Sequence, residues 1–181
     1  IAFYVSGSAQ SIVTAERLAL NFMQRMSGIA TQTNKITKMM EGTNCRLLDT
    51  RKTTPGFRFF EKLAVKIGGG VNHRFGLYDM ILVKDNHVDY AGGVHNALHQ
   101  IKNYLEKNER HLKIEVEARS MKEVEEILQE GIAFRILLDN FKPEQLKEAV
   151  AFINGRVETE ASGGITEDNV REYALSGVDY I

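Results

Sequence analysis

Short apolar segments alternate with helical segments along most of this chain, and that alternation limits the folds open to it. Strands are expected at residues 45–49, 80–83, 112–117, 134–138, 157–160 and 178–181, with helical segments between successive strands. Strict β–α alternation is typical of parallel strands joined by right-handed crossovers, in a barrel or in an open doubly wound sheet. No single glycine-rich nucleotide turn dominates, so we favour an incomplete parallel α/β barrel, because six strands are too few for the usual eight.

The turn at residues 50–56 joins the first expected strand to a helix. Thr54 followed by Pro55 is a pattern typical of a helix start, with Thr54 as the N-cap, and the helix is expected over residues 57–67. Arg51 and Lys52 then lie at the carboxyl end of a strand, side by side. Other helix ends carry clear signals, a capping box and a terminal glycine among them: Ser120, Glu123 and Gly131.

Charge is distributed unevenly along the chain. The net charge is −1, but basic residues outnumber acidic ones between Arg17 and Lys84 and the reverse holds elsewhere. This asymmetry favours an anionic partner, and without a dense basic run interleaved with aromatic residues it favours small anions over nucleic acid. One cysteine excludes an internal disulfide, and the chain has no paired Cys/His pattern for zinc. No apolar run is long enough to span a membrane and no secretory signal is visible, so we expect a cytoplasmic protein.

Charged or phosphate-binding residue types stand at successive expected strand ends. They are Arg51, Lys52, Lys84, Glu115 or Glu117, Asp139 and the turn Ser162-Gly163-Gly164. Ligands of barrels and doubly wound sheets bind at the carboxyl ends of the strands. Guanidinium groups bind carboxylates or phosphates with paired hydrogen bonds, two carboxylates beside phosphates suit Mg²⁺, and a Ser-Gly-Gly turn before a helix offers amides to a phosphate.

A nucleophilic triad is not favoured. Cys45 begins a strand and so lies at the wrong end of the sheet. His73 and His87 stand among cations in the sequence, which would favour neutral imidazole rings.

Seven groups of residues, taken in order, resemble the quinolinate phosphoribosyltransferase family, the carboxylating nicotinate-nucleotide pyrophosphorylases. They lie at residues 15–31, 49–56, 68–77, 84–87, 114–117, 138–140 and 162–165. The resemblance implies an incomplete, TIM-like α/β barrel preceded by an amino-terminal α/β domain, working as a homodimer or a multiple of dimers. It implies phosphoribosyl transfer from phosphoribosyl pyrophosphate to quinolinate, with loss of pyrophosphate and CO₂, which yields nicotinate mononucleotide for NAD synthesis.

The resemblance also implies roles for individual residues. The quinolinate carboxylates are matched by Arg51, His73, Arg74 and Lys84, with Arg17 reaching the partner subunit's site. The phosphoribosyl pyrophosphate side is matched by Lys52, Ser162, Gly163 and Gly164. The expected catalytic residues are Lys52, Glu117 and Asp139, the two carboxylates acting near Mg²⁺ without direct coordination. Glu117 is preferred to Glu115 because of its spacing to Asp139.

Two departures from the family pattern define the expected domains. Residues 1–40 are expected to be a helical connection from an absent amino-terminal domain, and residues 41–181 a catalytic barrel cut short at its carboxyl end. The family's further glycine-rich phosphate turn has no match here, so we expect a fragment of a longer protein.

Three other interpretations stay open. Lys84 at a strand end could form a Schiff base in a barrel lyase, although the surrounding cations would then have no clear purpose. A non-catalytic protein that binds phosphate or dicarboxylates would need the same cations. A relative attributed to molybdenum transport would share two of the matching groups, but the retention of Lys84 and Asn86 favours quinolinate.

Overall fold

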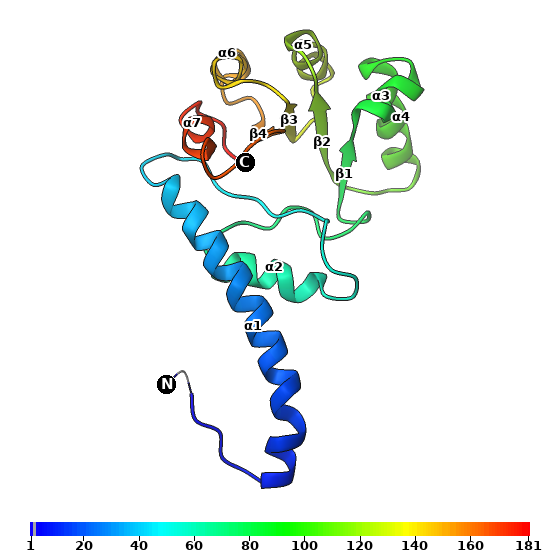
Figure 1. The fold of residues 1–181 in the computed structure, drawn as a ribbon. Coiled ribbons are helices and arrows are strands. Elements are labelled where there is room, and N and C mark those ends of the chain that lie inside the picture. The colour runs from blue at the N-terminus through cyan, green and yellow to red at the C-terminus, as the bar shows by residue number, and fades with distance from the viewer. Residues whose placement is uncertain (2) are drawn as a thin grey trace.

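Four parallel strands form the central sheet of the computed structural model, which describes residue 1 and residues 3–181. Along the sheet they lie in chain order: β1 (Met80–Val83), β2 (Lys113–Ala118), β3 (Arg135–Asp139) and β4 (Glu158–Ser162). Helices connect the strands and cover one face of the sheet, as Figure 1 shows: α3 (Asp85–Ala91), α4 (Val94–Lys107), α5 (Met121–Glu130), α6 (Pro143–Ile153) and α7 (Val170–Ala174). The parallel α/β architecture is as predicted.

The sheet continues past β4 through single parallel bridges. Tyr180 bridges both Glu160 and Arg46, and Leu48 bridges Val71. The expected strands at residues 178–181 and 45–49 are therefore paired side by side, although each is too short to form a ladder. The segment at Val71 adds a pairing that the sequence does not predict, and the succession of parallel neighbours gives an incomplete barrel.

Alternation along the strands separates an apolar face from a charged one. Val83, Val116 and Leu138 belong to the hydrophobic core and are almost completely buried. Strand neighbours in sequence point to opposite faces, so the other face carries the charged side chains of the strands: Glu115, Glu117, Arg135, Asp139, Glu158 and Glu160. Buried charges are costly unless they are paired, so the pairing of these residues determines the chemistry inside the curved sheet.

Several helix ends match the sequence signals. α6 begins and ends where predicted, with proline in its first turn. Ser120 caps α5 by accepting the Glu123 amide at 3.3 Å, and Gly131 ends that helix in the left-handed conformation at φ 67°. α3 is an additional short helix that the sequence analysis does not predict.

The predicted N-cap of α2 (Arg58–Ile67) at Thr54 is wrong, although the helix lies within the predicted residues 57–67. Phe57 occupies the N-cap position. The Thr54 amide instead donates to the Glu61 carboxylate at 3.2 Å, and its carbonyl accepts the Phe57 amide at 2.9 Å in a turn. A side chain from the helix itself thus holds the turn outside the helix.

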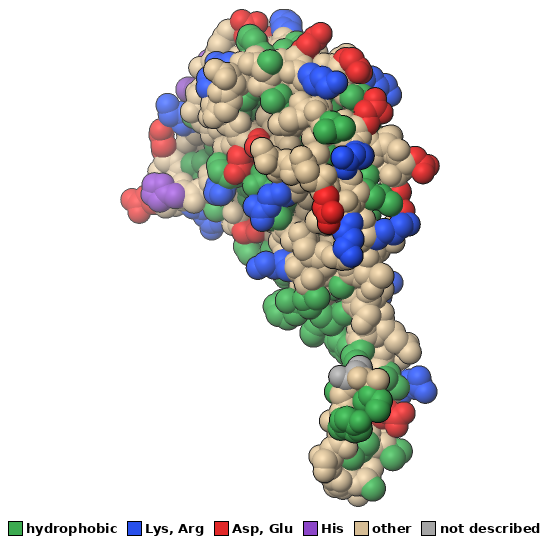
Figure 2. Space-filling view, turned by 90° about the vertical axis from the view of Figure 1, so that its left-hand side faces the viewer, with side chains coloured by type: hydrophobic (Ala, Val, Ile, Leu, Met, Phe, Trp, Pro, Cys, Tyr) green, Lys and Arg blue, Asp and Glu red, His purple; other side chains and the backbone are tan. Residues whose placement is uncertain are grey.

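The first helix, α1 (Ala9–Met39), extends away from the sheet as a stem and packs beside α2 (Figure 1). Figure 2 shows hydrophobic side chains on the stem, and the exposed ones near its amino-terminal end are Phe3, Tyr4, Val5, Val13 and Leu18. None of the helices in the described part of the chain has the length and apolar character needed to cross a membrane.

Candidate active site

The basic turn that contains Arg51 is held by side chains of two helices. Arg58 donates to the Arg51 carbonyl at 3.2 Å, to the Thr53 hydroxyl at 3.1 Å and to the Phe75 carbonyl at 3.1 Å. A second set of contacts joins the turn to α1 and α2: Arg25, Thr54 and Glu61. The Arg58 guanidinium therefore fixes the turn at residues 51–53 against the loop that follows Arg74.

Arg51 and Arg74 bring two guanidinium groups together. Burial lowers the pKa of Arg74, and the positive charge of Arg51 lowers it further. The second effect requires the two cations to be near each other. The Arg74 Nη1 donates to the Met80 carbonyl at 3.2 Å. The Arg51 Nε is buried and has no hydrogen-bond partner among the described residues. A buried guanidinium N–H without a partner beside a second guanidinium is suited to bind an anion such as a carboxylate.

A cluster of charged side chains lies deeper inside the sheet; we call His73, Glu115, Glu160 and Arg135 the floor cluster. The His73 Nε2 lies 2.6 Å from Glu115 and 3.5 Å from Glu160. The Arg135 Nη1 lies 3.2 Å from Glu160 and 3.9 Å from Glu115. The possible ligand atoms of His73 and the two glutamates lie within 4.8 Å of one another, as in metal sites, but Arg135 already supplies positive charge there.

The charge of His73 follows from its carboxylate neighbours. Burial opposes protonation, but the contacts with Glu115 and Glu160 outweigh burial and raise the pKa of His73 to about 9. The Arg74 amide lies 2.7 Å from Nδ1 and favours the neutral ring, yet a neutral hydrogen bond contributes only about 1 kcal/mol, less than charge-assisted contacts. The predicted neutral ring is therefore wrong for His73, because the nearest charged groups are carboxylates.

Asp49 and Lys62 form a buried ion pair behind the His73 segment, with side chains 7% and 2% exposed. Burial raises the pKa of Asp49, and the hydrogen bond from Lys62 opposes that rise. The Asp49 carboxylate also accepts the His73 amide at 2.9 Å. The ion pair thus ties α2 to the loop that carries His73 and Arg74, a role that the sequence analysis does not predict.

Glu117 and Asp139 lie at the carboxyl-terminal edge of the sheet. Burial raises the pKa of Glu117, and the negative charges of Asp139 and Asp85 raise it further, which requires these carboxylates to be close. The side-chain Nδ2 of Asn140 donates to the Asp139 carboxylate at 2.5 Å. Glu115 instead points into the floor cluster, so Glu117 is the glutamate that shares the edge with Asp139. Close carboxylates at an open edge are suited to a divalent cation that also binds phosphate oxygens.

The Ser-Gly-Gly turn follows β4 directly, at the same edge of the sheet. Gly163 and Gly164 have positive φ angles of 97° and 69°. The helix predicted at residues 166–175 is shorter than expected, since α7 begins only at Val170. An anion at this turn would therefore depend on turn amides, because the helix N-terminus is not adjacent to Gly164.

We expect Gly163→Ala to lower the free energy of unfolding by about 1–3 kcal/mol from the backbone conformation alone, the usual cost of a residue in a sparsely populated conformation. A Cβ at Gly163 would also collide with the Asn140 side chain, which donates to Asp139. Urea denaturation measures the change. Gly155→Ala is the matched control: Gly155 has a similar positive φ of 69° but open space around its Cβ position, so an equal loss in both variants would contradict the collision.

The remaining predicted residues are exposed. Lys52 and Lys84 lie at the same edge as Glu117 and Asp139, and the Lys84 charge acts on the Glu117 carboxyl. Arg17 is exposed on α1, about two turns before Arg25, the residue through which this helix reaches the basic turn. The structure brings together the residues of the strand ends but leaves Arg17 apart from them.

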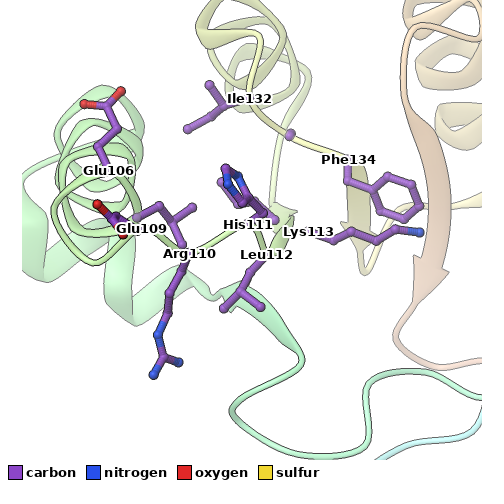
Figure 3. Close-up of a pocket in the computed structure, with 11 residues that line it drawn as sticks. Glu106, Glu109, Arg110, His111, Leu112, Lys113, Ile132 and Phe134 are labelled. Atoms are coloured by element: carbon purple, nitrogen blue, oxygen red, sulfur yellow. The ribbon is translucent and has the colours of Figure 1, made fainter.

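A hollow of about 980 Å³ lies at the opposite end of the sheet (Figure 3). It is lined by apolar and charged side chains of the segments that precede β2 and β3. Lys113 lies over the Phe134 ring at 3.6 Å. None of the predicted site residues lines this hollow, so its size does not make it the better candidate for the active site.

Comparisons with known proteins agree with this arrangement. Residues 29–181 match the family model described as quinolinate phosphoribosyl transferase, C-terminal domain. The chain is 48% identical over 191 residues to quinolinate phosphoribosyltransferase (decarboxylating) 1b of Nicotiana tabacum, covering 98% of the chain and 54% of that relative. It is 39% identical over 175 residues to a probable nicotinate-nucleotide pyrophosphorylase (carboxylating) of Bacillus subtilis, covering 97% and 59%. The crystal structure of NadC from Streptococcus pyogenes superposes with a TM-score of 0.89 at 41% identity, covering 96% of the chain and 60% of that protein. The chain thus spans little more than half the length of these relatives.

Proposed function

The chain belongs to the quinolinate phosphoribosyltransferase family, and on that premise we propose that it forms most of the barrel site of an enzyme that makes nicotinate mononucleotide. The reaction joins quinolinate to the phosphoribosyl group of phosphoribosyl pyrophosphate and releases pyrophosphate and CO₂. The observation that carries the proposal is the buried Nε of Arg51, which has no hydrogen-bond partner among the described residues and lies near Arg74. A dicarboxylate ligand would supply an acceptor for Arg51 and a counter-charge for both guanidinium groups.

We assign quinolinate to the basic side of the site. Arg51 and Arg74 would bind its carboxylates with paired hydrogen bonds, and Lys84 would add a point charge at the edge. The predicted contact between His73 and quinolinate would come from an imidazolium ring, since His73 lies among carboxylates. Bound in this way, the substrate would have its ring nitrogen directed toward the acidic edge.

We assign phosphoribosyl pyrophosphate to the acidic edge. Lys52 would stabilise the departing pyrophosphate, and the turn at Ser162, Gly163 and Gly164 would bind the 5′-phosphate. Glu117 and Asp139 would face the positive charge that develops on the ribose as the ring nitrogen attacks the anomeric carbon. Their proximity fits Mg²⁺ held through water, which would neutralise the charge of the pyrophosphate.

The reaction then needs positioning and electrostatic stabilisation and no protein nucleophile. Once the ring nitrogen is quaternised, its positive charge stabilises the electron pair that stays on the ring carbon as the C–C bond breaks and CO₂ leaves, and that carbon then takes a proton from water. This agrees with the position of Cys45, which is buried away from the strand ends and whose pKa burial raises to about 12.

We propose that the complete protein works as a homodimer or a multiple of dimers. The exposed Arg17 would then reach the partner's site from α1, and the exposed hydrophobic side chains of the stem would be covered by protein. Sedimentation of the full-length protein tests the dimer. The cytoplasmic location stays a prediction, to be tested by cell fractionation.

The decisive experiment is an assay for nicotinate mononucleotide with the full-length protein, quinolinate, phosphoribosyl pyrophosphate and Mg²⁺. Product formation that stops when Mg²⁺ is chelated would support the proposal. Binding of quinolinate without product would favour a binding protein. Trapping of a carbonyl substrate on Lys84 by borohydride would favour the Schiff-base lyase.

Asp139→Asn is expected to lower kcat about tenfold or more and to leave the Kd of quinolinate nearly unchanged. The variant keeps the shape of the side chain but removes a negative charge that would act on the ribose and Mg²⁺, and a tenfold loss corresponds to about 1.4 kcal/mol in the barrier. Steady-state kinetics and calorimetry measure the two quantities. Asp168→Asn, at an exposed position in the loop before α7, is the matched control. A parallel loss of quinolinate affinity would place Asp139 on the other substrate.

A further inference from the structure

Glu115 combines complete burial with incomplete hydrogen bonding. Its side chain is 0% exposed, and neither carboxylate oxygen has a well-aligned hydrogen bond in the described part of the chain. Its contacts are mainly electrostatic: the His73 Nε2 at 2.6 Å and the Arg135 Nη1 at 3.9 Å. A buried carboxylate held in this way is costly for stability, so its retention at the centre of a sheet needs a reason.

We infer that Glu115 is a positioning residue, which acts from the floor of the sheet through His73 to hold the Arg74 segment in the geometry of the anion pocket. The inference rests on the proposed function and extends it to a residue that would not touch either substrate. The floor cluster is connected to the pocket through His73 itself. Nε2 of its imidazole lies 2.6 Å from Glu115, and His73 directly precedes Arg74 in the loop.

Glu115 also supplies negative charge to the Arg74 guanidinium without a direct ion pair to it. Its charge raises the pKa of Arg74, opposing the effects of burial and of Arg51. A carboxylate in direct contact with both arginines would compete with a dicarboxylate ligand. Placed behind His73, the same charge helps to hold the cations together and leaves their N–H groups available.

Other charges around His73 distinguish Glu115 from its neighbours. The His73 ring faces Glu115 from β2 and Glu160 from β4, and Arg135 from β3 acts on the ring through these two glutamates. The backbone of His73 is followed by Arg74 and is bound by Asp49, which pairs with Lys62. Glu160 is farther from the ring, at 3.5 Å, and is also bound by Arg135 at 3.2 Å. Glu115 is therefore the carboxylate most directly committed to His73.

Glu115→Gln in the full-length protein tests the inference, with Glu158→Gln as the matched control. Glu158 contacts the same Arg135 at 2.7 Å but lies outside the floor cluster, with a side chain 34% exposed. Loss of an outer partner that orients a functional group commonly costs 10- to 100-fold. We expect calorimetry to show about tenfold weaker quinolinate binding for Glu115→Gln and little change for Glu158→Gln.

The pH dependence separates positioning through His73 from general loss of structure. In the wild type, burial raises the pKa of Glu115 to about 7 and the carboxylate contacts raise that of His73 to about 9, so quinolinate affinity should be flat between about pH 7 and 8, where both groups are charged. Without the Glu115 charge the pKa of His73 falls toward its ordinary value near 6.5, so the affinity of Glu115→Gln should decline as the pH rises through that range. Glu115→Asp, which keeps the charge, should restore the flat profile.

The inference would be overturned if Glu115→Gln and Glu158→Gln lost quinolinate affinity equally, or if the quinolinate affinity of Glu115→Gln did not change with pH. If Glu115→Gln does not fold, the pKa of the His73 ring can be measured by NMR in the wild type and in Glu115→Asp. A His73 pKa near its ordinary value in both proteins would also overturn the inference. Failure of the proposed function is distinguishable, because it would appear as absent nicotinate mononucleotide synthesis in the wild type while the His73 titration remained measurable.

Discussion

Arg51→Ala is expected to weaken quinolinate binding by about 100-fold or more. Removing one partner of a buried, hydrogen-bonded charge pair typically costs about 2–5 kcal/mol, because the other charge stays buried without a partner. Arg51 meets the conditions for a loss of that size, since its Nε is buried and its guanidinium lies near Arg74. Calorimetry on the full-length protein measures the Kd directly, independent of turnover.

Arg46→Ala is the control for this prediction. Arg46 lies in the same segment and has an exposed side chain, and its backbone pairs with residues 179–181. It should retain quinolinate affinity within about twofold. An unchanged Kd in Arg51→Ala would remove Arg51 from the pocket, and an equal loss in both variants would point to the general positive charge of this segment.

Much of the fold is predictable from the sequence because its signals are local. The strand patterns that became β1 to β4 and the proline and glycine signals around α5 and α6 act within a few residues. The errors arise where distant or competing contacts decide. The start of α2 moves because Glu61 takes the Thr54 amide, and the segment at Val71 pairs with Leu48 without a β-strand signal of its own.

The edge of the candidate site is also predictable, because the carboxyl ends of parallel strands meet at one edge of a sheet. The supporting residues are harder to predict, since Arg58 acts through backbone carbonyls that only the folded chain brings near it. The floor cluster, by contrast, could have been suspected from the sequence. Glu115, Arg135 and Glu160 are charges inside expected strands, and a charge in a buried strand requires a partner.

Lys62→Met is expected to lower the free energy of unfolding by about 3–5 kcal/mol at neutral pH. Methionine can fill the volume of the lysine stem, so the main loss is the ion pair, and breaking a buried pair leaves an uncompensated charge. The Asp49 carboxylate would remain 7% exposed with fewer partners. Burial already raises its pKa, so its protonation should reduce the loss in Lys62→Met as the pH is lowered. Urea denaturation at several pH values measures this change.

The double variant Asp49→Asn, Lys62→Met shows how much of the stability loss in Lys62→Met comes from the uncompensated charge of Asp49 and how much from lost packing. Asparagine keeps an oxygen that can accept the His73 amide, a contact that Asp49 makes at 2.9 Å, and it carries no charge. Replacing both members of a buried pair is often close to neutral, so the double variant should recover most of the stability that Lys62→Met loses, and its remaining loss should not depend on the Asp49 titration. If the double variant is as unstable as Lys62→Met, the uncompensated charge of Asp49 is not the cause of the loss, and the ion pair stabilises the barrel by fixing the direction in which Asp49 holds the His73 loop.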